Sequence, residues 1–328
     1  MKRTITTTFA AVAVLALAAA GCEKKDENKA GGASGAAGAA AAVPSKTGFA
    51  VFPADSKVIV GINVASARSS ALWAKYKDQI EKATGGELAE LKAACGIDPI
   101  AQAQTVIFGG NPNGPQGGDV VAVVKGFERS AMKSCGEKMA AKEGKQLAVV
   151  DEGNLSQYTV DGEVVWAAWL DDSTVVFAPN KDKAYVEARA KGEAGLTESA
   201  PIMALLKSVD TSAAIYLAAD ASVAGQGAAM APGAQGMFAS LRLTDGLAID
   251  AGVRFDTADN AKNLTTMATT QLSQMKGSLP PPFNSIAEKA VIKQVDKDLV
   301  VQLSLTGAEL EQVGQAVSGM AGGMLGGL

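Results

Sequence analysis

The chain has 328 residues, a formal net charge of −4 and no histidine. The absence of histidine excludes Ser-His-Asp and Cys-His nucleophile systems, HExxH metalloproteases and every histidine-dependent zinc or copper site. The slightly acidic balance, without a cluster of basic residues, predicts that nucleic acid is not a partner.

The N-terminal segment has the pattern of an export signal. Basic residues precede an apolar stretch from Phe9 to Ala20, which is shorter than the roughly 20 apolar residues that a membrane-spanning helix needs. The stretch ends in Ala-Ala-Gly, followed by Cys22. We therefore predict that residues 1–21 are a signal peptide. An ordinary secretory signal with an incidental cysteine is the alternative.

The sequence Ala19-Ala20-Gly21-Cys22 resembles the lipobox of bacterial lipoproteins, although Leu is commoner than Ala at the position of Ala19. In that family the cysteine is acylated with diacylglycerol and becomes the first mature residue. The resemblance implies acyl chains, such as palmitate, on Cys22, and thus a membrane anchor that needs no spanning helix. Asp after the cysteine often retains such proteins at the inner membrane, whereas this chain has Glu23. The resemblance therefore implies the outer membrane of the cell envelope, on its periplasmic face or at the surface.

Composition divides the mature chain into a linker, a body and a tail. Residues 22–48 are charged at first and then rich in Gly, Ala and Ser, which predicts a flexible, disordered tether. The body covers residues 49–318. Residues 319–328 are rich in Gly and Met, and we expect a disordered tail.

The first half of the body alternates strand and helix signals. The expected elements are a strand over 57–64, a helix over 69–94 broken at Gly85-Gly86, strands over 105–108 and 119–125, a helix over 128–142, strands over 146–150, 157–160, 163–170 and 173–178, and a helix ending near Lys191. Asp161-Gly162 suits a two-residue type I′ turn. Asn180 can cap the last helix.

The second half repeats this order with low residue identity. Residues 209–220 match 54–65, residues 241–264 match 119–134, and residues 295–313 match 170–188 without a gap. The second copy has a turn at Asp245-Gly246, a helix capped by Asp256, and a capping box of Thr306 and Glu309. We therefore predict an α+β fold of two degenerate copies, residues 49–198 and 199–318, each an antiparallel sheet with its helices on one face. Chance agreement of generic patterns is the alternative.

Short motifs in the body resemble a bacterial family of exported repeat domains of unknown function. The family's repeats open with Pro-Ala-Asp before a strand, as in Phe52-Pro53-Ala54-Asp55, and contain a Gly-Ile/Leu-Asp-Pro turn, as in Cys95-Gly96-Ile97-Asp98-Pro99. The resemblance implies a fold and no activity.

Two cysteines, Cys95 and Cys135, remain once Cys22 is assigned to the anchor. An oxidising compartment favours a disulfide between them. Two separate small core residues are the alternative, because the sequence cannot show that their Cα atoms lie within bonding range.

The body offers few groups for catalysis. Asp151-Glu152 and Asp171-Asp172 are carboxylate pairs of the kind that glycosidases use, but adjacent strand residues point to opposite faces and Asp favours turns. Tyr158, Trp166 and Trp169 could stack on a sugar, although Trp166 and Trp169 are expected on opposite faces of a strand. We therefore predict that the protein is not an enzyme and has no metal or other cofactor.

Residues 222–238 are small, apolar and rich in Gly at a point where a connection is expected. One interpretation of this stretch is a loop that covers a hydrophobic cavity, with Met230, Met237 and Phe238 as adaptable contacts. A disordered Ala-rich segment is the alternative.

Together these features predict a lipid-anchored cell-envelope protein that acts by binding or as a scaffold. Its expected partners are the membrane, through the lipid, and an envelope protein or a hydrophobic ligand. The second hypothesis is a periplasmic carrier of an acyl chain or a lipoprotein, with the 222–238 loop as its flap.

Overall fold

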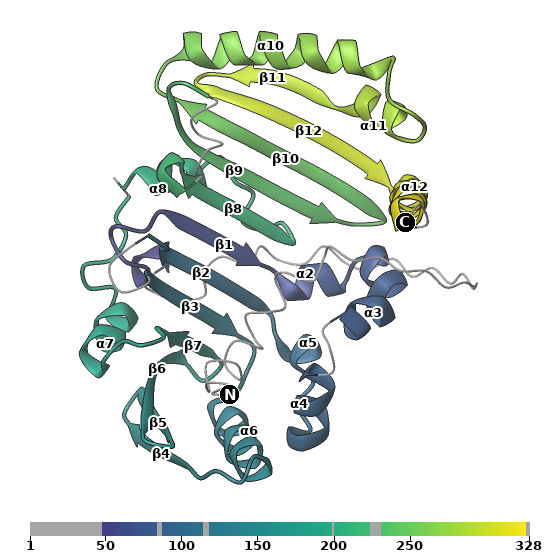
Figure 1. Cartoon of the computed structure of the whole chain (residues 1–328). Helices are drawn as coiled ribbons and strands as arrows, with labels where there is room; N and C mark the ends of the chain where they lie inside the picture. The colour runs from purple at the N-terminus through teal and green to yellow at the C-terminus, as the bar shows by residue number, and fades with distance from the viewer. Residues whose placement is uncertain (1–47, 84–86, 114–117, 199, 224–230, 326–328) are drawn as a thin grey trace.

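The computed structural model describes residues 48–83, 87–113, 118–198, 200–223 and 231–325 (Figure 1). The predicted signal peptide, Cys22 and nearly all of the predicted tether lie outside the described residues.

One twelve-stranded antiparallel sheet organises the described chain, in the order β11-β12-β10-β9-β8-β1-β2-β3-β7-β6-β5-β4. The strands are β1 Val58–Ile62, β2 Thr105–Asn111, β3 Asp119–Lys125, β4 Leu147–Glu152, β5 Leu155–Val160, β6 Glu163–Asp171, β7 Thr174–Phe177, β8 Ile215–Asp220, β9 Ala234–Leu243, β10 Gly246–Phe255, β11 Val291–Val295 and β12 Asp298–Thr306. An α+β fold with a large antiparallel sheet was predicted, and the structure agrees at this level.

The two halves of the body meet within this sheet. The first half contributes β1-β2-β3-β7-β6-β5-β4 and the second β8-β9-β10-β12-β11, each counted from the centre outward. Strands β1 and β8 join them as antiparallel neighbours, with Val60 opposite Leu217. The sheet is therefore continuous across the boundary that the sequence predicted between residues 198 and 199.

Helices surround the sheet on both faces. They are η1 Gly48–Val51, α2 Val64–Arg68, α3 Ala71–Ala83, α4 Glu87–Cys95, α5 Pro99–Gln102, α6 Arg129–Lys142, α7 Lys183–Lys191, α8 Pro201–Leu206, η3 Ala221–Val223, α10 Ala258–Lys276, α11 Phe283–Lys289 and α12 Gly307–Leu325.

Consecutive residues of β2 show which helices cover which face of the sheet. Ile107 packs in a buried cluster with residues of η1, α7 and α8, whereas Val106 packs in a second cluster with residues of α6. Consecutive strand residues point to opposite faces. The prediction that helices cover one face was therefore wrong: η1, α7 and α8 cover one face, called here the α8 face, and α6 lies on the other. A third buried cluster joins α10 to β10 and β12.

Several local signals in the sequence are confirmed. Asp161 and Gly162 have φ of 52° and 83°, as a type I′ hairpin turn requires. Thr306 and Glu309 form the expected capping box, with the Thr306 amide donating to Glu309 Oε2 at 2.9 Å. Lys289, followed by the Thr306 amide and hydroxyl, lowers the pKa of Glu309 to about 2.

Two predicted caps were wrong by one or two residues. Asp182, not Asn180, caps α7, its carboxylate accepting from the Tyr185 amide at 2.8 Å. Thr257, not Asp256, caps α10. Competing Asx and hydroxyl side chains at a helix start satisfy the same free amides, so sequence alone does not choose between them.

The predicted tail was also wrong in part, because α12 continues to Leu325. Its capping box starts the helix. The Ala, Met and Leu residues that follow favour helix extension, whereas the glycines at 319, 322 and 323 oppose it.

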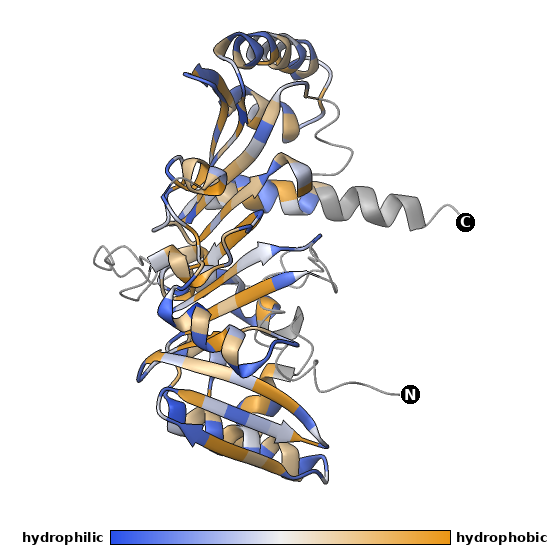
Figure 2. Cartoon of the chain, turned by 90° about the vertical axis from the view of Figure 1, so that its left-hand side faces the viewer, coloured by the Kyte–Doolittle hydropathy of each residue, from blue (hydrophilic) through white to orange (hydrophobic). Residues whose placement is uncertain are grey.

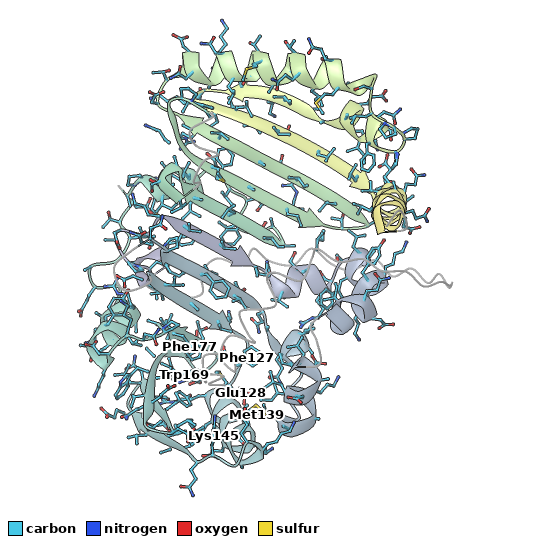
Figure 3. All side chains as sticks on the ribbon, viewed as in Figure 1. Phe127, Glu128, Met139, Lys145, Trp169 and Phe177 are labelled. Carbon is cyan, nitrogen blue, oxygen red and sulfur yellow. A yellow bond between two sulfur atoms is a disulfide. The ribbon has the colours of Figure 1, made fainter. Side chains whose placement is uncertain are left out.

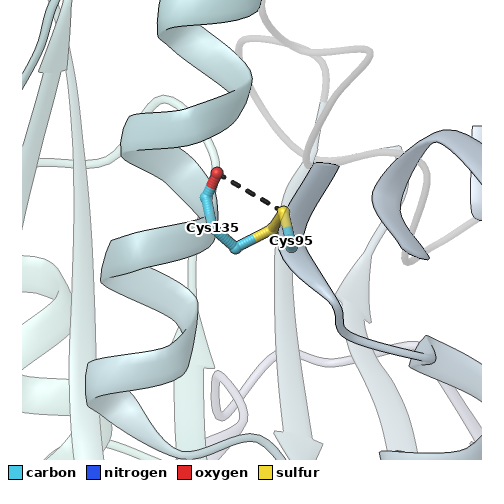
Figure 4. The surroundings of a disulfide bond; sticks show 2 residues. All are labelled: Cys95 and Cys135. Carbon is cyan, nitrogen blue, oxygen red and sulfur yellow. Dashed lines mark hydrogen bonds between the residues drawn. A yellow bond between two sulfur atoms is a disulfide. The ribbon is translucent and has the colours of Figure 1, made fainter. Parts of the chain in front are cut away.

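A disulfide joins α4 to α6 (Figure 4). The Cα atoms of Cys95 and Cys135 lie 4.8 Å apart, so the pairing that the sequence favoured is the one present. Lys142 and Glu90 add an ion pair at 3.5 Å between the same two helices.

Within the described part of the chain, no helix combines the length and the apolar character needed to cross a membrane.

Candidate functional site: an apolar sheet face

A row of apolar residues crosses the middle of the sheet on the face opposite α8. Each residue lies directly opposite the next across neighbouring strands, and such partners share a face. The row is Phe108, Val60, Leu217, Ala239, Ala251 and Val301. Phe108 packs against the α6 cluster and Val301 against the α10 cluster. Both clusters therefore lie on one face, called here the α10 face, with a stretch of sheet between them.

That stretch is the apolar floor, which we define by nine half-buried residues on the α10 face: Val58 and Val60 of β1, Ile215 and Leu217 of β8, Met237, Ala239 and Leu241 of β9, and Ile249 and Ala251 of β10. These side chains are aliphatic except for the thioether of Met237. None of them carries a charge or a strong hydrogen-bonding group.

Helices border the apolar floor rather than cover it. Helices α10, α11 and α12 contact β10, β11 or β12, and α2 contacts β2 and β9. Figure 1 shows α10 along one border of the sheet and α2, α3 and α12 near one end of the strands, with β9 and β10 drawn uncovered along their length. None of the nine residues belongs to the buried clusters of the described chain.

The α8 face of the same strands is packed in the ordinary way. Ile59, Tyr216, Ala218 and Phe238 are at most 5% exposed and form one cluster with η1 and α8. Strands β1 and β8 therefore carry mainly apolar residues on both faces, yet the described helices bury only the α8 face. Figure 2 shows this hydrophobic character as orange stretches along the central strands.

The structure corrects the end of the loop predicted over residues 222–238, because residues 234–238 belong to strand β9. Met230 lies outside the described residues, whereas Met237 and Phe238 belong to strand β9. Met237 points to the apolar floor and Phe238, which is 5% exposed, to the buried α8 face. The overlooked signal was alternation: apolar residues at 237, 239, 241 and 243 have the period of a strand.

A polar cluster holds the start of α6 on the β4-β5 hairpin. Arg129 donates to Asp151 Oδ1 at 2.7 Å, to the Ser156 hydroxyl at 3.1 Å and to the Gly153 carbonyl at 2.7 Å. Ser156 also donates to Asp151 at 2.7 Å. This hydroxyl, followed by Arg129 and Lys133, holds the pKa of Asp151 below its usual value. Asp151 is thus an ionised structural partner.

The predicted carboxylate pairs do not converge. Asp151 is paired with Arg129, while the adjacent Glu152 is paired with Lys183 at the start of α7. Asp171 instead closes the β6-β7 turn, accepting from the Ser173 amide at 2.8 Å. Asp151, Glu152 and Asp171 therefore each have a structural partner.

The predicted aromatic contacts are divided between the two faces. Trp169 is 5% exposed and packs with Phe127 and Phe177 beneath α6 (Figure 3). Its indole donates to the Ser156 hydroxyl at 3.2 Å. Tyr158 is 4% exposed in the same cluster. Trp166 lies on the α8 face, with Lys183 Nζ 5.5 Å from its ring centroid. They do not form one open stacking platform.

Across the described residues, no group of three or more Cys, Asp or Glu side chains is placed to hold a metal ion. Comparison with protein-family models, with curated proteins and with solved structures finds no match for this chain. The apolar floor is thus interpreted from its own geometry.

Proposed function

We propose that this chain is a lipid-anchored protein of the cell envelope, without catalytic activity, that binds the aliphatic part of a hydrophobic ligand on its apolar floor. The observation that carries the proposal is the row from Phe108 to Val301, whose central residues are apolar and half-buried. Contiguous apolar side chains that stay partly accessible on one face of a sheet are a candidate binding surface.

The chemistry of the apolar floor favours a hydrocarbon chain over other ligands. Specific recognition of a polar or aromatic molecule needs precisely placed polar groups among the apolar ones, and the nine residues supply none. Neighbouring strands lie about 4.8 Å apart, so the four strands of the apolar floor span about 15–20 Å. Acyl chains of envelope lipids, or of lipoproteins in transit, fit this description.

The anchor supports the same proposal from the sequence. Acyl chains on Cys22 would hold the apolar floor close to a source of lipid. In this proposal the membrane is the outer membrane, because Glu23 and not Asp follows Cys22. In this proposal residues 1–21 are removed on export and residues 22–48 connect the anchor to the body.

We also infer that the body arose by duplication. The strand order from the centre outward is β1-β2-β3-β7-β6 in one half and β8-β9-β10-β12-β11 in the other. The sequence matches at 54–65 and 209–220 and at 170–188 and 295–313 fall on corresponding members of these two series. Strands β4 and β5 extend the first half alone.

The proposed binding is tested on the mature chain carrying Cys22→Ser, titrated with fluorescently labelled palmitic acid. Ala251→Glu places a carboxylate in the middle of the apolar floor, and Ala248→Glu places the same group on the opposite face of β10, next to Arg242. Both alanines are half-buried. Because an unpaired charge against hydrocarbon is costly, we expect Ala251→Glu to weaken binding at least about tenfold, which corresponds to about 1.4 kcal/mol. Ala248→Glu should retain it.

Equal binding by the two variants would show that the fatty acid lies elsewhere. No binding by the Cys22→Ser chain itself would contradict the proposed ligand and leave a partner protein as the occupant to seek. Lipid released by organic solvent from protein purified out of cells would identify the natural ligand.

A further inference from the structure

We propose that the acyl chains on Cys22 occupy the apolar floor of their own chain whenever the protein is away from a membrane. This inference rests on the proposed function, because it requires both the lipid on Cys22 and an apolar floor that accepts aliphatic chains. It concerns the regulation of that site: the floor would be shielded off the membrane and open once the anchor inserts into a bilayer.

The first described residues lie close to the strands of the apolar floor, which brings the floor within reach of the acyl chains on Cys22. Helix η1 begins at Gly48 and packs on the α8 face. Phe52, which follows it, lies against Gly109 and Ile59. Ile59 lies between Val58 and Val60 of the apolar floor on β1. The chain that leads to Cys22 therefore starts behind the apolar floor, on the other side of the same strand.

The number of residues between Cys22 and Gly48 sets how far the lipid can reach. As the flexible chain that its composition predicts, the about 26 residues from Cys22 to Gly48 would span about 25–30 Å root mean square. Fully extended, the same segment would reach about 85–95 Å. It is long enough to pass round the end of β1 and reach the opposite face. A tether that matches its span gives effective concentrations in the millimolar range, so even weak affinity of an acyl chain for the apolar floor would suffice.

The free energy of burying the acyl chains decides whether they occupy a bilayer or the apolar floor. Transfer into a bilayer gains about 0.8 kcal/mol for each buried methylene. The apolar floor contacts a chain from one side, so it recovers only part of this gain. The bilayer therefore wins when one is present, and the apolar floor wins over water when none is. The same residues thus shield the lipid during transit and are released for another ligand at the membrane.

The test uses residues 22–328, in which Cys22 is the single free thiol because Cys95 and Cys135 are bonded. Cys22 is alkylated with N-hexadecylmaleimide in one sample and with N-ethylmaleimide in the other. Labelled palmitic acid is the binding probe. We expect the hexadecyl protein to bind it at least about tenfold more weakly than the ethyl protein, and phosphatidylcholine vesicles to restore binding by withdrawing the hexadecyl chain.

A matched pair of variants locates the hexadecyl chain. Ala251→Glu should expose the chain, so that the hexadecyl protein self-associates in sedimentation analysis. Ala248→Glu, on the opposite face of the same strand, should leave it monomeric.

The two proposals fail in different ways. Equal probe binding by the ethyl and hexadecyl proteins, or self-association of the unsubstituted hexadecyl protein, overturns self-shielding and leaves the apolar floor as a ligand site. Absence of probe binding by the ethyl protein overturns the proposed function. Mass analysis that finds an unmodified Cys22 on protein isolated from cells overturns the anchor and self-shielding together.

Discussion

Gly61 and Tyr216 face each other where the two halves of the sheet join. Tyr216 is 1% exposed, and its ring lies over Gly61 so closely that a methyl group there would overlap the ring. Burial raises the pKa of the Tyr216 hydroxyl, which has no hydrogen-bond partner among the described residues. Tyr216 therefore contributes to this joint by packing, with its ring filling the space that the missing Gly61 side chain leaves.

Gly61→Ala is expected to lower the free energy of unfolding by about 2–3 kcal/mol, because the added methyl overpacks a buried contact. Urea denaturation measures the change. The penalty should be smaller when Tyr216→Ala is already present, since the obstructing ring is gone. Gly277→Ala is the control, because nothing lies within 4 Å of its added methyl, and its effect should stay within about 0.5 kcal/mol. An equal penalty in both backgrounds would contradict the role given to the ring.

At the scale of elements, α4 and α6 form a pair that borders the α10 face of the first half. Their disulfide and the Lys142–Glu90 ion pair connect them, while α4 has residues of intermediate burial and no fully buried side chain among those described. A helix with so little burial gains little from packing. The disulfide is therefore expected to supply much of the stability of this pair.

Replacing both Cys95 and Cys135 with Ser should lower the free energy of unfolding by about 4 kcal/mol, the chain-entropy value for a loop of 40 residues. Thermal or urea unfolding of the Cys22→Ser chain measures it. Adding a thiol reductant should destabilise the disulfide-containing chain by a similar amount and leave the double variant unchanged. A double variant as stable as its parent would contradict this assignment.

Sequence signals of short range predicted the elements well. The Asp161-Gly162 turn and the Thr306 capping box depend on a few neighbouring residues, and such signals survive in one sequence. Elements that depend on pairing with distant residues were predicted less well. The Gly- and Ala-rich composition before Met237 concealed the start of β9, because its pairing with β8 and β10 supplies the order that local propensity lacks.

The sequence predicted the hydrophobic character of the candidate site but not its location or most of its residues. Sequence indicated a hydrophobic contact surface and included Met237 in it, but placed that residue on a loop and paired it with Phe238, which points to the other face. An alternating strand shows which residues share a face and not which face helices will cover. That coverage is decided by where α8 and α10 pack, which the residues of β9 do not encode.

For the whole molecule, the main consequence of the continuous sheet is a shared core. The cluster on the α8 face combines Val51, Ile59 and Val121 from the first half with Tyr216 and Phe238 from the second. Strands β1 and β8 exchange their hydrogen bonds along the entire length of β1. The two halves of the body therefore share one buried core and one sheet.

We expect neither residues 49–198 nor residues 199–318 to fold when produced alone, because each would expose a central strand and half of the shared cluster. Far-UV and near-UV circular dichroism of each fragment should show loss of fixed packing, whereas the Cys22→Ser chain should unfold in one urea transition with both probes coincident. Mixing the fragments should restore near-UV signal only if β1 and β8 pair, so Tyr216→Arg, which places a charge in the buried joint, should prevent the recovery. A fragment that unfolds cooperatively by itself would instead establish two domains that merely share a sheet edge.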